Sequence, residues 1–415
     1  MNKPARRRGP GLFLCLAPFA LSAVLLGAAR RVPAWAEWYA LHIYPLFPHT
    51  VGRLAGLIPL SLFELLLLAL GAGALLLTAW VLLALAAPAA RRGGGFFRPL
   101  CAGFGLLCLL FTLTAGINYN REPFADRYGL PVRAPAAGEL RALYGELVAE
   151  AAAAAALGGA EAAEPNRSAA NEWRKEARRA MSRLSRRYAL ISSYPPPKPV
   201  FFSPTMSRLG ISGIFSPFTL EANYNSDMPA FQIPSALCHE LAHLAGYMRE
   251  EEANFIAYLA CRESFSPAFR YSGALFALGY VLDALRAVSS AQEYAALLAE
   301  LPPAAAEDFR LAGEYWRQYA GRAAELQTEL NDAYLRANAQ SAGVESYGLV
   351  VDLLLAYRRG DFSEQWKVES GKWLVESVSF YNGMDFRRGG WQFGLGGIGD
   401  SIRPRRMVSR TCAGT

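Results

Sequence analysis

The sequence has 415 residues, of which 53% are hydrophobic and only 19% are charged. Soluble domains have about a quarter charged residues, so this composition excludes a disordered chain and disfavours a wholly cytosolic enzyme. The formal net charge is +7, but no basic stripe interleaved with aromatic residues occurs, so nucleic acid is not an expected partner. Six cysteines are too few for a disulfide-based scaffold.

Three apolar runs occupy the N-terminal part of the chain, near residues 11–29, 61–90 and 99–117. Each has about 19 residues or more, which is enough to cross a hydrocarbon core of about 30 Å as a helix. We therefore assign residues 1–118 to a helical transmembrane region with three spans. A cleaved signal peptide is the alternative for the first run, since basic residues precede it and its GAA end is a possible cleavage site.

The basic residues around these runs predict the orientation of the chain in the membrane. Seven basic residues lie before the first run or between the second and third runs: Lys3, Arg6, Arg7, Arg8, Arg91, Arg92 and Arg98. Residues 30–60, between the first and second runs, carry only three basic residues. Because short cytoplasmic loops hold the excess of Lys and Arg, the N-terminus is predicted to be cytoplasmic and the chain after residue 118 extracytoplasmic. Glu64, near the start of the second run, is interpreted as an interfacial carboxylate.

The next segment is predicted to be helical and then extended. Residues 119–200 are assigned to a helical connecting region, whose alanine-rich stretch at 148–163 is interpreted as a surface helix or a flexible linker. The run SSYPPPKPVFFSP at 192–204 is typical of an extended connection. Residues 210–227 are rich in Ile, Phe, Thr and Tyr between Gly and Pro, which predicts one or two strands.

The rest of the chain is predicted to be mostly helical, with breaks at Gly246, Ser266-Pro267, Pro302-Pro303 and Gly343. Residues 201–385 are assigned to one domain and residues 386–415 to a tail rich in Gly and Arg. The glycines of the tail do not follow a strand and open a helix, so the tail is not expected to bind phosphate.

One motif dominates the soluble half: His239-Glu240-Leu241-Ala242-His243, an HExxH sequence. On a helix, residues four apart share a face, so His239 and His243 can bind the same metal ion. Glu240 is rotated by about 100° from His239, which suits a general base acting on the attacking water. With only four histidines in the chain, an accidental match is expected well under about one time in a hundred.

The third ligand is expected to be a carboxylate or, less favourably, a cysteine, because the other two histidines belong to the membrane half. Glu250, Glu251 and Glu252 begin the helix after the turn at Gly246. We predict Glu250 as the ligand, with Glu252 in reserve, because Asn254 lies four residues later and can support a histidine from the same face. For two of the three glutamates, a solvated first helical turn favoured by the helix dipole is the expected role.

Other residues are weaker candidates. The strand around residues 219–224 is predicted either to pair with an extended peptide or to be a plain core strand. Tyr271 and Tyr347 are candidates, by residue type alone, to donate a hydrogen bond to a developing oxyanion. Cys238 and Cys261 flank the motif and are interpreted as small buried residues in preference to a disulfide.

Several stretches of the chain, the motif included, resemble a known family. They are residues 52–66, 117–130, 210–225, 238–261, 269–285 and 331–360. These stretches are similar to bacterial membrane proteins known as domain of unknown function (DUF) 3810, whose members look like zincin-type metallopeptidases. The resemblance implies three spans in the bacterial cell membrane and an external zinc-peptidase-like domain. It implies no substrate, because the family has none assigned.

The expected architecture is therefore a three-span transmembrane region followed by a mostly α-helical, α+β, zincin-like metallopeptidase domain. In the expected function, His239, His243 and Glu250 hold Zn²⁺, while Glu240 takes a proton from water and delivers it to the leaving amine. The expected partners are a peptide or protein substrate and the lipid bilayer. The alternative is a catalytically silent, zinc-stabilised receptor or assembly factor. A transporter is disfavoured, because three spans are few and Glu64 is the only ionisable residue inside one.

Overall fold

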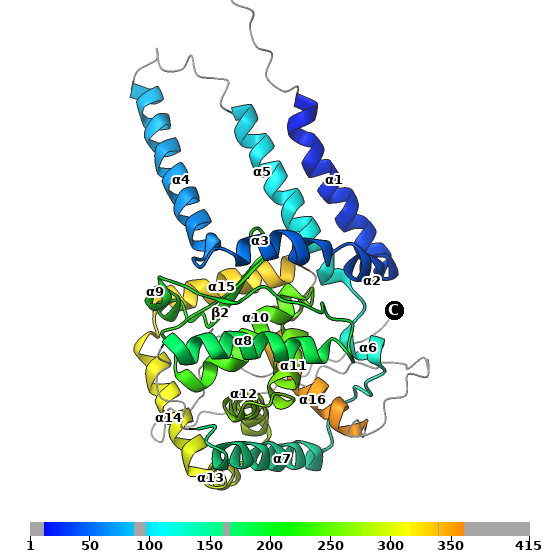
Figure 1. The fold of residues 1–415 in the computed structure, drawn as a ribbon, viewed down its shortest axis with the longest axis vertical. Coiled ribbons are helices and arrows are strands. Elements are labelled where there is room, and N and C mark those ends of the chain that lie inside the picture. Colours follow the sequence, from blue (N-terminus) through cyan, green and yellow to red (C-terminus); the bar gives the residue numbers. More distant parts are fainter. Residues whose placement is uncertain (1–11, 87–96, 161–166, 339, 361–415) are drawn as a thin grey trace, which may run out of the picture.

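The computed structural model of the protein describes residues 12–86, 97–160, 167–338 and 340–360. The described residues are mostly helical (73%), with a few short strands. Figure 1 shows three long helices, α1, α4 and α5, rising on one side of a larger helical domain, with α2 and α3 lying across the boundary. The predicted tail, together with residues 361–385 of the predicted domain, lies outside the described residues.

The N-terminal region contains α1 (Leu12–Arg31), α2 (Pro33–His42), the π-helical turn η1 (Pro48–Gly52), α3 (Arg53–Gly56), α4 (Leu62–Ala86), α5 (Phe97–Phe111) and the turns η3 (Thr112–Gly116) and η4 (Asn118–Asn120). Two segments are long and apolar enough to cross a membrane, Leu62–Leu83 and Leu100–Asn120. The helices Cys15–Arg31 and Pro33–His42 are bent by 112° and make a third span if counted together. The bend lies at Pro33, which has no N–H to continue the first helix. The chain therefore has two or three helices that can span a membrane.

The domain that follows contains α6 (Phe124–Tyr128), α7 (Ala137–Ala156), α8 (Arg167–Leu184), β1 (Lys198–Pro199), α9 (Ser203–Arg208), β2 (Gly213–Ser216), β3 (Glu221–Tyr224), η5 (Ala230–Gln232), α10 (Ile233–Leu244), α11 (Glu250–Arg262), α12 (Pro267–Val288), α13 (Ala291–Ala299), α14 (Pro303–Gln318), α15 (Arg322–Ala337), η6 (Gly343–Leu349) and α16 (Val350–Arg359). The four predicted helix breaks, at Gly246, Pro267, Pro303 and Gly343, all coincide with the gaps or beginnings of these helices. Each break follows from a residue that cannot continue a helix, since Pro lacks an N–H and Gly readily adopts other conformations.

One hydrophobic core joins α7 and α8 to α10, α11, α12 and α16. The alanine-rich helix α7 packs along α12 and buries Leu143, Tyr144 and Leu147 against it. Residues 119–200 were expected to form a helical connecting region, and 148–163 a surface helix or a flexible linker. The described residues of 148–163 are mainly the end of α7, a helix that exposes Ala149, Ala152, Ala153 and Ala156 but buries Ala151 and Ala154. α7 and α8 both contribute to the core that surrounds the HExxH helix, because the earlier part of α7 carries large apolar residues at helical spacing.

A three-stranded sheet covers one side of α10, in the order β1–β3–β2. β3 is the central strand, parallel to β1 and antiparallel to β2, with Gly213 opposite Tyr224. Residues 210–227 were predicted to form one or two strands and contain two, β2 and β3, and the proline-rich run 192–204 adds the short strand β1.

A buried ion pair attaches α2 to the loop that follows η4. Nε and Nη2 of Arg121 donate to the two carboxylate oxygens of Glu37 at 3.0 and 2.9 Å, and Nη1 donates to the backbone carbonyl of Gly246 at 3.2 Å. Arg127 also pairs with Glu37, at 2.7 Å. Because Gly246 directly follows α10, this pair links the N-terminal region to the helix that carries the motif.

The start of α4 is attached to the sheet by two carboxylates. Glu221 of β3 pairs with buried Lys198 and accepts the backbone N–H groups at the start of α4. Glu64 accepts the backbone N–H groups of Phe201 and Phe202 at 2.8 and 2.9 Å. Glu64 therefore lies at the base of α4 and binds the domain, in agreement with an interfacial position.

Candidate metal centre

The HExxH sequence lies on α10, whose side chains are almost all buried. The helix ends before Gly246, as predicted, and Gly246 has a φ of +90° that favours glycine. A Cβ atom at this position would also lie 3.0 Å from the ring of Tyr44. The Tyr44 hydroxyl donates to the backbone carbonyl of Leu244 at 3.1 Å. The loop after α2 thus fixes the C-terminal end of the motif helix.

Three potential ligand atoms converge between α10 and α11. The Nε2 atoms of His239 and His243 lie 3.0 Å apart. Oε2 of Glu250, the first residue of α11, lies 3.3 Å from the former nitrogen and 3.5 Å from the latter. This oxygen is buried and has no hydrogen bond of normal geometry within the described part of the chain. The predicted pair of histidines and the predicted glutamate are therefore brought together, with their ligand atoms facing one another.

The three consecutive glutamates have different environments. Only Glu250 faces the histidines. Glu252 accepts the backbone N–H of Phe124 at 2.7 Å and pairs with Arg249 at 2.8 Å. Glu251 accepts a hydrogen bond from Gln340 at 3.1 Å. Glu252, the reserve candidate, is engaged in attaching α6 to α11 and does not reach the centre.

Hydrogen bonds orient the ring of one histidine. Nδ1 of His243 lies 2.8 Å from the backbone carbonyl of Tyr247, so an N–H there donates to this carbonyl and leaves Nε2 directed at His239 and Glu250. Nδ1 of His239 is buried without a hydrogen-bond partner among the described residues. Burial lowers the pKa of His239, although Glu250 and Asn254 act in the opposite direction. The side-chain N–H of Asn254 donates to the hydroxyl of Tyr280 at 3.2 Å, so the support of a histidine by Asn254 stays a prediction.

Glu250 and His243 shift each other's pKa values. Burial alone would raise the pKa of Glu250, but the positive charge of His243 and the neighbouring imidazoles hold this pKa below its usual value. Burial alone would lower the pKa of His243, but Glu250, Glu240 and the Tyr247 carbonyl raise it to about 9. The site therefore favours a negative carboxylate beside positive charge, an environment that also suits a bound cation.

Glu240 is buried beside the three ligand atoms. Glu240 is only 3% exposed, and its Oε2 atom has no hydrogen-bond partner among the described residues. Burial, reinforced by the charge of Glu250, raises the pKa of Glu240 to about 8. Gly213 of β2 makes room for it, since a Cβ atom at Gly213 would lie 2.7 Å from Cγ of Glu240 and overlap the carboxylate.

The sheet order decides between the two readings of the strand around residues 219–224. β3, within these residues, is the central strand, and both of its edges are occupied by β1 and β2. It is therefore a plain core strand and does not pair with a peptide. The outer strands among the described residues are β1 and β2, of which β2 contacts α10 directly. Local composition identified a strand but not its place in the sheet.

Of the two tyrosines chosen by residue type, Tyr271 is engaged outside the centre. Its hydroxyl donates to Asp308 at 2.6 Å, which joins α12 to α14. The side chain of Tyr347 lies outside the described part of the structure, although its backbone belongs to η6, so its role stays a prediction. Tyr280 of α12 accepts a hydrogen bond from Asn254 at 3.2 Å. Burial, reinforced by the charge of Glu250, raises the pKa of Tyr280 and of Tyr334 on α15. Nothing in the local sequence around either tyrosine indicated this influence.

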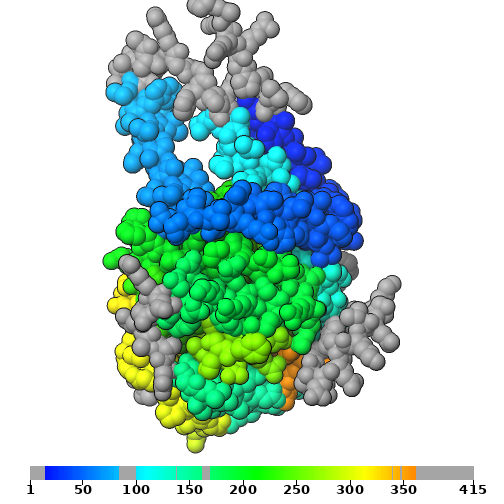
Figure 2. Space-filling view, viewed as in Figure 1, coloured from blue at the N-terminus to red at the C-terminus, as the bar shows by residue number. Residues whose placement is uncertain are grey.

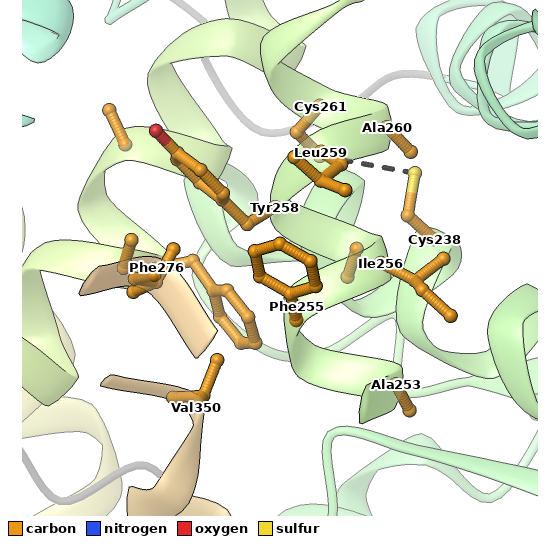
Figure 3. Close-up of a cluster of buried hydrophobic side chains, with 14 of the residues drawn as sticks. Cys238, Ala253, Phe255, Ile256, Tyr258, Leu259, Ala260, Cys261, Phe276 and Val350 are labelled. Atoms are coloured by element: carbon orange, nitrogen blue, oxygen red, sulfur yellow. Dashed lines mark hydrogen bonds between the residues drawn. The ribbon is translucent and has the colours of Figure 1, made fainter. Parts of the chain in front are cut away.

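Cys238 and Cys261 lie behind the centre, in the core shared by α10 and α11. Figure 3 shows their sulfur atoms facing each other next to Ile256, and the Sγ–Sγ distance is 3.9 Å. Both are free and fully buried. Burial raises the pKa of the Cys261 thiol well above its usual value, so Cys261 is not disposed to act as a metal-binding thiolate. They are small buried core residues, as interpreted.

The fold and the centre define a mostly helical chain that has two or three potential membrane spans and a His-His-Glu cluster. The family model DUF3810, described as a protein of unknown function, matches residues 39–355. The chain therefore belongs to the DUF3810 family, which confirms the resemblance. No curated protein and no solved structure matches it.

Proposed function

We propose that the protein is a membrane-anchored, zinc-dependent metallopeptidase that hydrolyses peptide bonds on the extracytoplasmic side of the bacterial cell membrane. The observation that carries this proposal is the convergence of His239, His243 and Glu250 beside the buried carboxyl group of Glu240. Two imidazoles and one carboxylate form the donor set of catalytic zinc sites that keep a fourth position open.

The spacing of the three ligand atoms fits a zinc ion. Tetrahedral zinc with bonds of about 2.0–2.2 Å places its ligand atoms about 3.4 Å from one another. The separations between the nitrogens of His239 and His243 and the oxygen of Glu250 are 3.0, 3.3 and 3.5 Å. Oε2 of Glu250 supports the same assignment, since it is buried without a hydrogen bond of normal geometry and only positive charge at the two imidazoles, or a bound cation, offsets the cost of its burial.

The residues around this centre supply the other parts of a peptidase. Zinc, when bound, would polarise the scissile carbonyl and acidify the attacking water. Glu240 would accept the proton of that water at Oε2, which has no competing hydrogen bond, and deliver it to the leaving amine. The free edge of β2 would hold an extended peptide through main-chain hydrogen bonds, and Gly213 on this strand touches Glu240.

Metal content of the purified full-length chain in detergent tests this proposal. The full chain is needed because Arg121 is buried against Glu37, and a fragment without α2 would leave it unpaired. We expect about one zinc per chain in the wild type and in Glu251→Ala, and its loss in Glu250→Ala. A folded wild-type chain without zinc would contradict the proposal.

Glu240→Gln separates a peptidase from the alternative, a catalytically silent receptor or assembly factor. This variant is expected to keep its zinc and its fold while losing hydrolysis of a fluorogenic peptide library, because an amide cannot accept the proton. Zinc binding by the wild type without hydrolysis of any library member, even at high enzyme concentration, would favour the silent alternative.

The proposed side of the membrane rests on the distribution of basic residues, with the N-terminus in the cytoplasm. Arg317, exposed on α14, is a suitable reporter position. Arg317→Cys in intact cells is expected to react with a membrane-impermeant maleimide, while the buried Cys238 and Cys261 do not. Labelling only after cell lysis would reverse the orientation.

A further inference from the structure

The helix α15 has three distinct faces when its residues are placed at 100° intervals. One face is buried and contains Ala324, Thr328 and Leu335. A second is exposed and charged, with Arg322, Glu325, Glu329 and Arg336. The third is exposed and apolar, with Ala323, Leu326, Leu330 and Ala333. Leu326 and Leu330 are 52% and 63% exposed, so this apolar face is not covered by any described part of the chain.

The apolar face of α15 lies next to the base of the candidate membrane spans. Arg30, at the end of α1, donates to the backbone carbonyl of Ala337 at 3.2 Å. The ring of Tyr334, which borders the apolar face, meets the ring of Phe111, the last residue of α5, with centroids 6.2 Å apart. Figure 1 shows α15 running just below the level of α3. The C-terminal end of α15 is thus held against α1 and α5.

The other end of α15 lies on the side of α4. The preceding helix, α14, is attached through the hydroxyl of Tyr315 to Ser207 of α9. The first turn of α9 is in turn attached to α4, because Phe202 donates its backbone N–H to Glu64. Figure 2 shows that α4 stands apart from α1 and α5, with an open gap between them. α15 therefore runs from the α4 side of the domain to the α1–α5 side.

Other apolar side chains are exposed at the same boundary. Leu54 of α3 is 66% exposed, and Leu57, in the turn after α3, is 80% exposed. Phe201, beside the base of α4, is 81% exposed. Exposed apolar side chains beside membrane spans, bordered by charged residues, are typical of a segment that rests in the headgroup region of a bilayer.

We infer that α15 lies on the bilayer surface, with Leu326 and Leu330 in contact with lipid and the charged face in water. The occupant of this face is lipid because the face carries no charge and because α15 lies at the base of the spans, with its C-terminal end held against α1 and α5. The motif helix α10 is also attached at the base of the spans, because the carbonyls of Leu244 and Gly246 accept hydrogen bonds from Tyr44 and Arg121. The centre is thereby held close to the lipid–water boundary.

Photocrosslinking of the full-length protein in vesicles of phosphatidylethanolamine and phosphatidylglycerol tests this contact without using enzyme activity. A benzoylphenylalanine residue is placed at Leu330, at Glu329 on the charged face as the matched control, and at Leu76 of α4 as the positive control. We expect phospholipid adducts by mass spectrometry at Leu330 and Leu76, and at least about tenfold fewer at Glu329, because only the apolar face meets lipid.

Each other result would overturn the inference. An adduct between position 330 and a polypeptide, whether this chain or a second copy, would assign the apolar face to a protein contact. No adduct at position 330 together with lipid adducts at Leu76 would place the face in water. Circular dichroism of each variant checks that the helices are formed, so that failure to fold is not mistaken for loss of contact.

This position also defines a substrate class, a consequence that rests on the proposed peptidase function. A site at the lipid–water boundary favours polypeptides that are themselves anchored in the membrane, since anchoring raises their local concentration. One fluorogenic peptide library, made with and without a palmitoyl chain, is offered to the protein in the same vesicles. We expect the anchored form to be cleaved at least about tenfold faster. Equal rates would refute the substrate class, whereas no cleavage of either form by the zinc-loaded protein would count against the peptidase function and leave the crosslinking result standing.

Discussion

The helices α10 and α15 depart from the usual amphipathic pattern in opposite ways. α10 is buried, yet it carries His239, Glu240 and His243 into the interior. α15 is on the surface, yet it exposes Leu326 and Leu330. Buried ionisable groups and exposed apolar stripes both cost stability unless a partner meets them. Each departure therefore supports a proposed partner, a metal ion for α10 and a lipid surface for α15.

The two helices also differ in what holds them. α10 is enclosed by α11, α12, β2 and β3, and its C-terminal end is bonded to Tyr44 and Arg121. α15 is held by one buried face and by contacts at its ends. Substitutions around α10 are therefore expected to have larger effects than substitutions on the exposed faces of α15, and four predictions test this ordering.

The largest effect is expected where the end of α10 is attached to α2. Arg121→Ala removes a buried guanidinium that is 3% exposed and leaves Glu37 with one remaining partner, Arg127. Breaking such a pair costs about 3–5 kcal/mol of unfolding free energy. Arg127→Ala, a partly exposed partner of the same carboxylate, is the matched control and should cost far less. Equal losses in thermal or denaturant unfolding would show that the attachment does not depend on the buried pair.

Removal of metal is expected to come next. If zinc binds the folded chain, a free zinc concentration about a thousandfold above the dissociation constant raises the free energy of unfolding by about 4 kcal/mol. A chelator should therefore lower the unfolding temperature of the wild type, measured by scanning fluorimetry. Glu250→Ala should show no such response, whereas Glu251→Ala should behave like the wild type. A response to the chelator that survives in Glu250→Ala would move the metal to another site.

The contact between β2 and Glu240 is expected to affect turnover more than stability. In Gly213→Ala the new methyl group overlaps the Glu240 carboxylate and displaces it. A shift of about 1 Å in a catalytic group lowers turnover about a hundredfold, while zinc content should remain unchanged. Gly145→Ala, on α7, serves as the control, because no atom lies within 4 Å of a Cβ atom added at this position. It should leave turnover unaltered. Full activity in Gly213→Ala would remove Glu240 from its proposed role.

The smallest effect is expected on the exposed faces of α15. Leu330→Arg places a charge on the face inferred to meet lipid, which near a bilayer interface costs up to about 1 kcal/mol. This cost should appear as a lower unfolding temperature in lipid nanodiscs. Glu329→Arg, on the charged face, should cause no such change. A larger loss for Glu329→Arg than for Leu330→Arg would invert the assignment of the two faces.

Local patterns in the sequence were sufficient for the individual elements. Pro267, Pro303 and Gly246 mark helix ends because of their own backbone chemistry, and the spacing of His239 and His243 requires a shared helix face. The choice of Glu250 among three glutamates followed from the same helical spacing, through Asn254. Each of these inferences used residues within a few positions of one another.

Contacts between distant segments were not predictable in this way. The alanine-rich sequence of α7 predicted a surface helix or a linker, and its packing along α12, more than a hundred residues later, was not foreseen. The outer strands of the sheet are β1 and β2, whereas the strand nearer the motif is central. Tyr271 was selected by residue type, whereas Tyr280, two and a half helical turns later, is the residue beside Asn254.

The sequence by itself determined that this protein has apolar helices, a family membership and an HExxH helix followed by a carboxylate, because these depend on composition and on spacing along one element. Only the tertiary structure decided which oxygen faces the histidines, which strand edge is free, and that α15 passes beneath the spans with Leu330 exposed. The physical reason is that packing joins elements far apart in the chain, and no local pattern specifies which surfaces will meet.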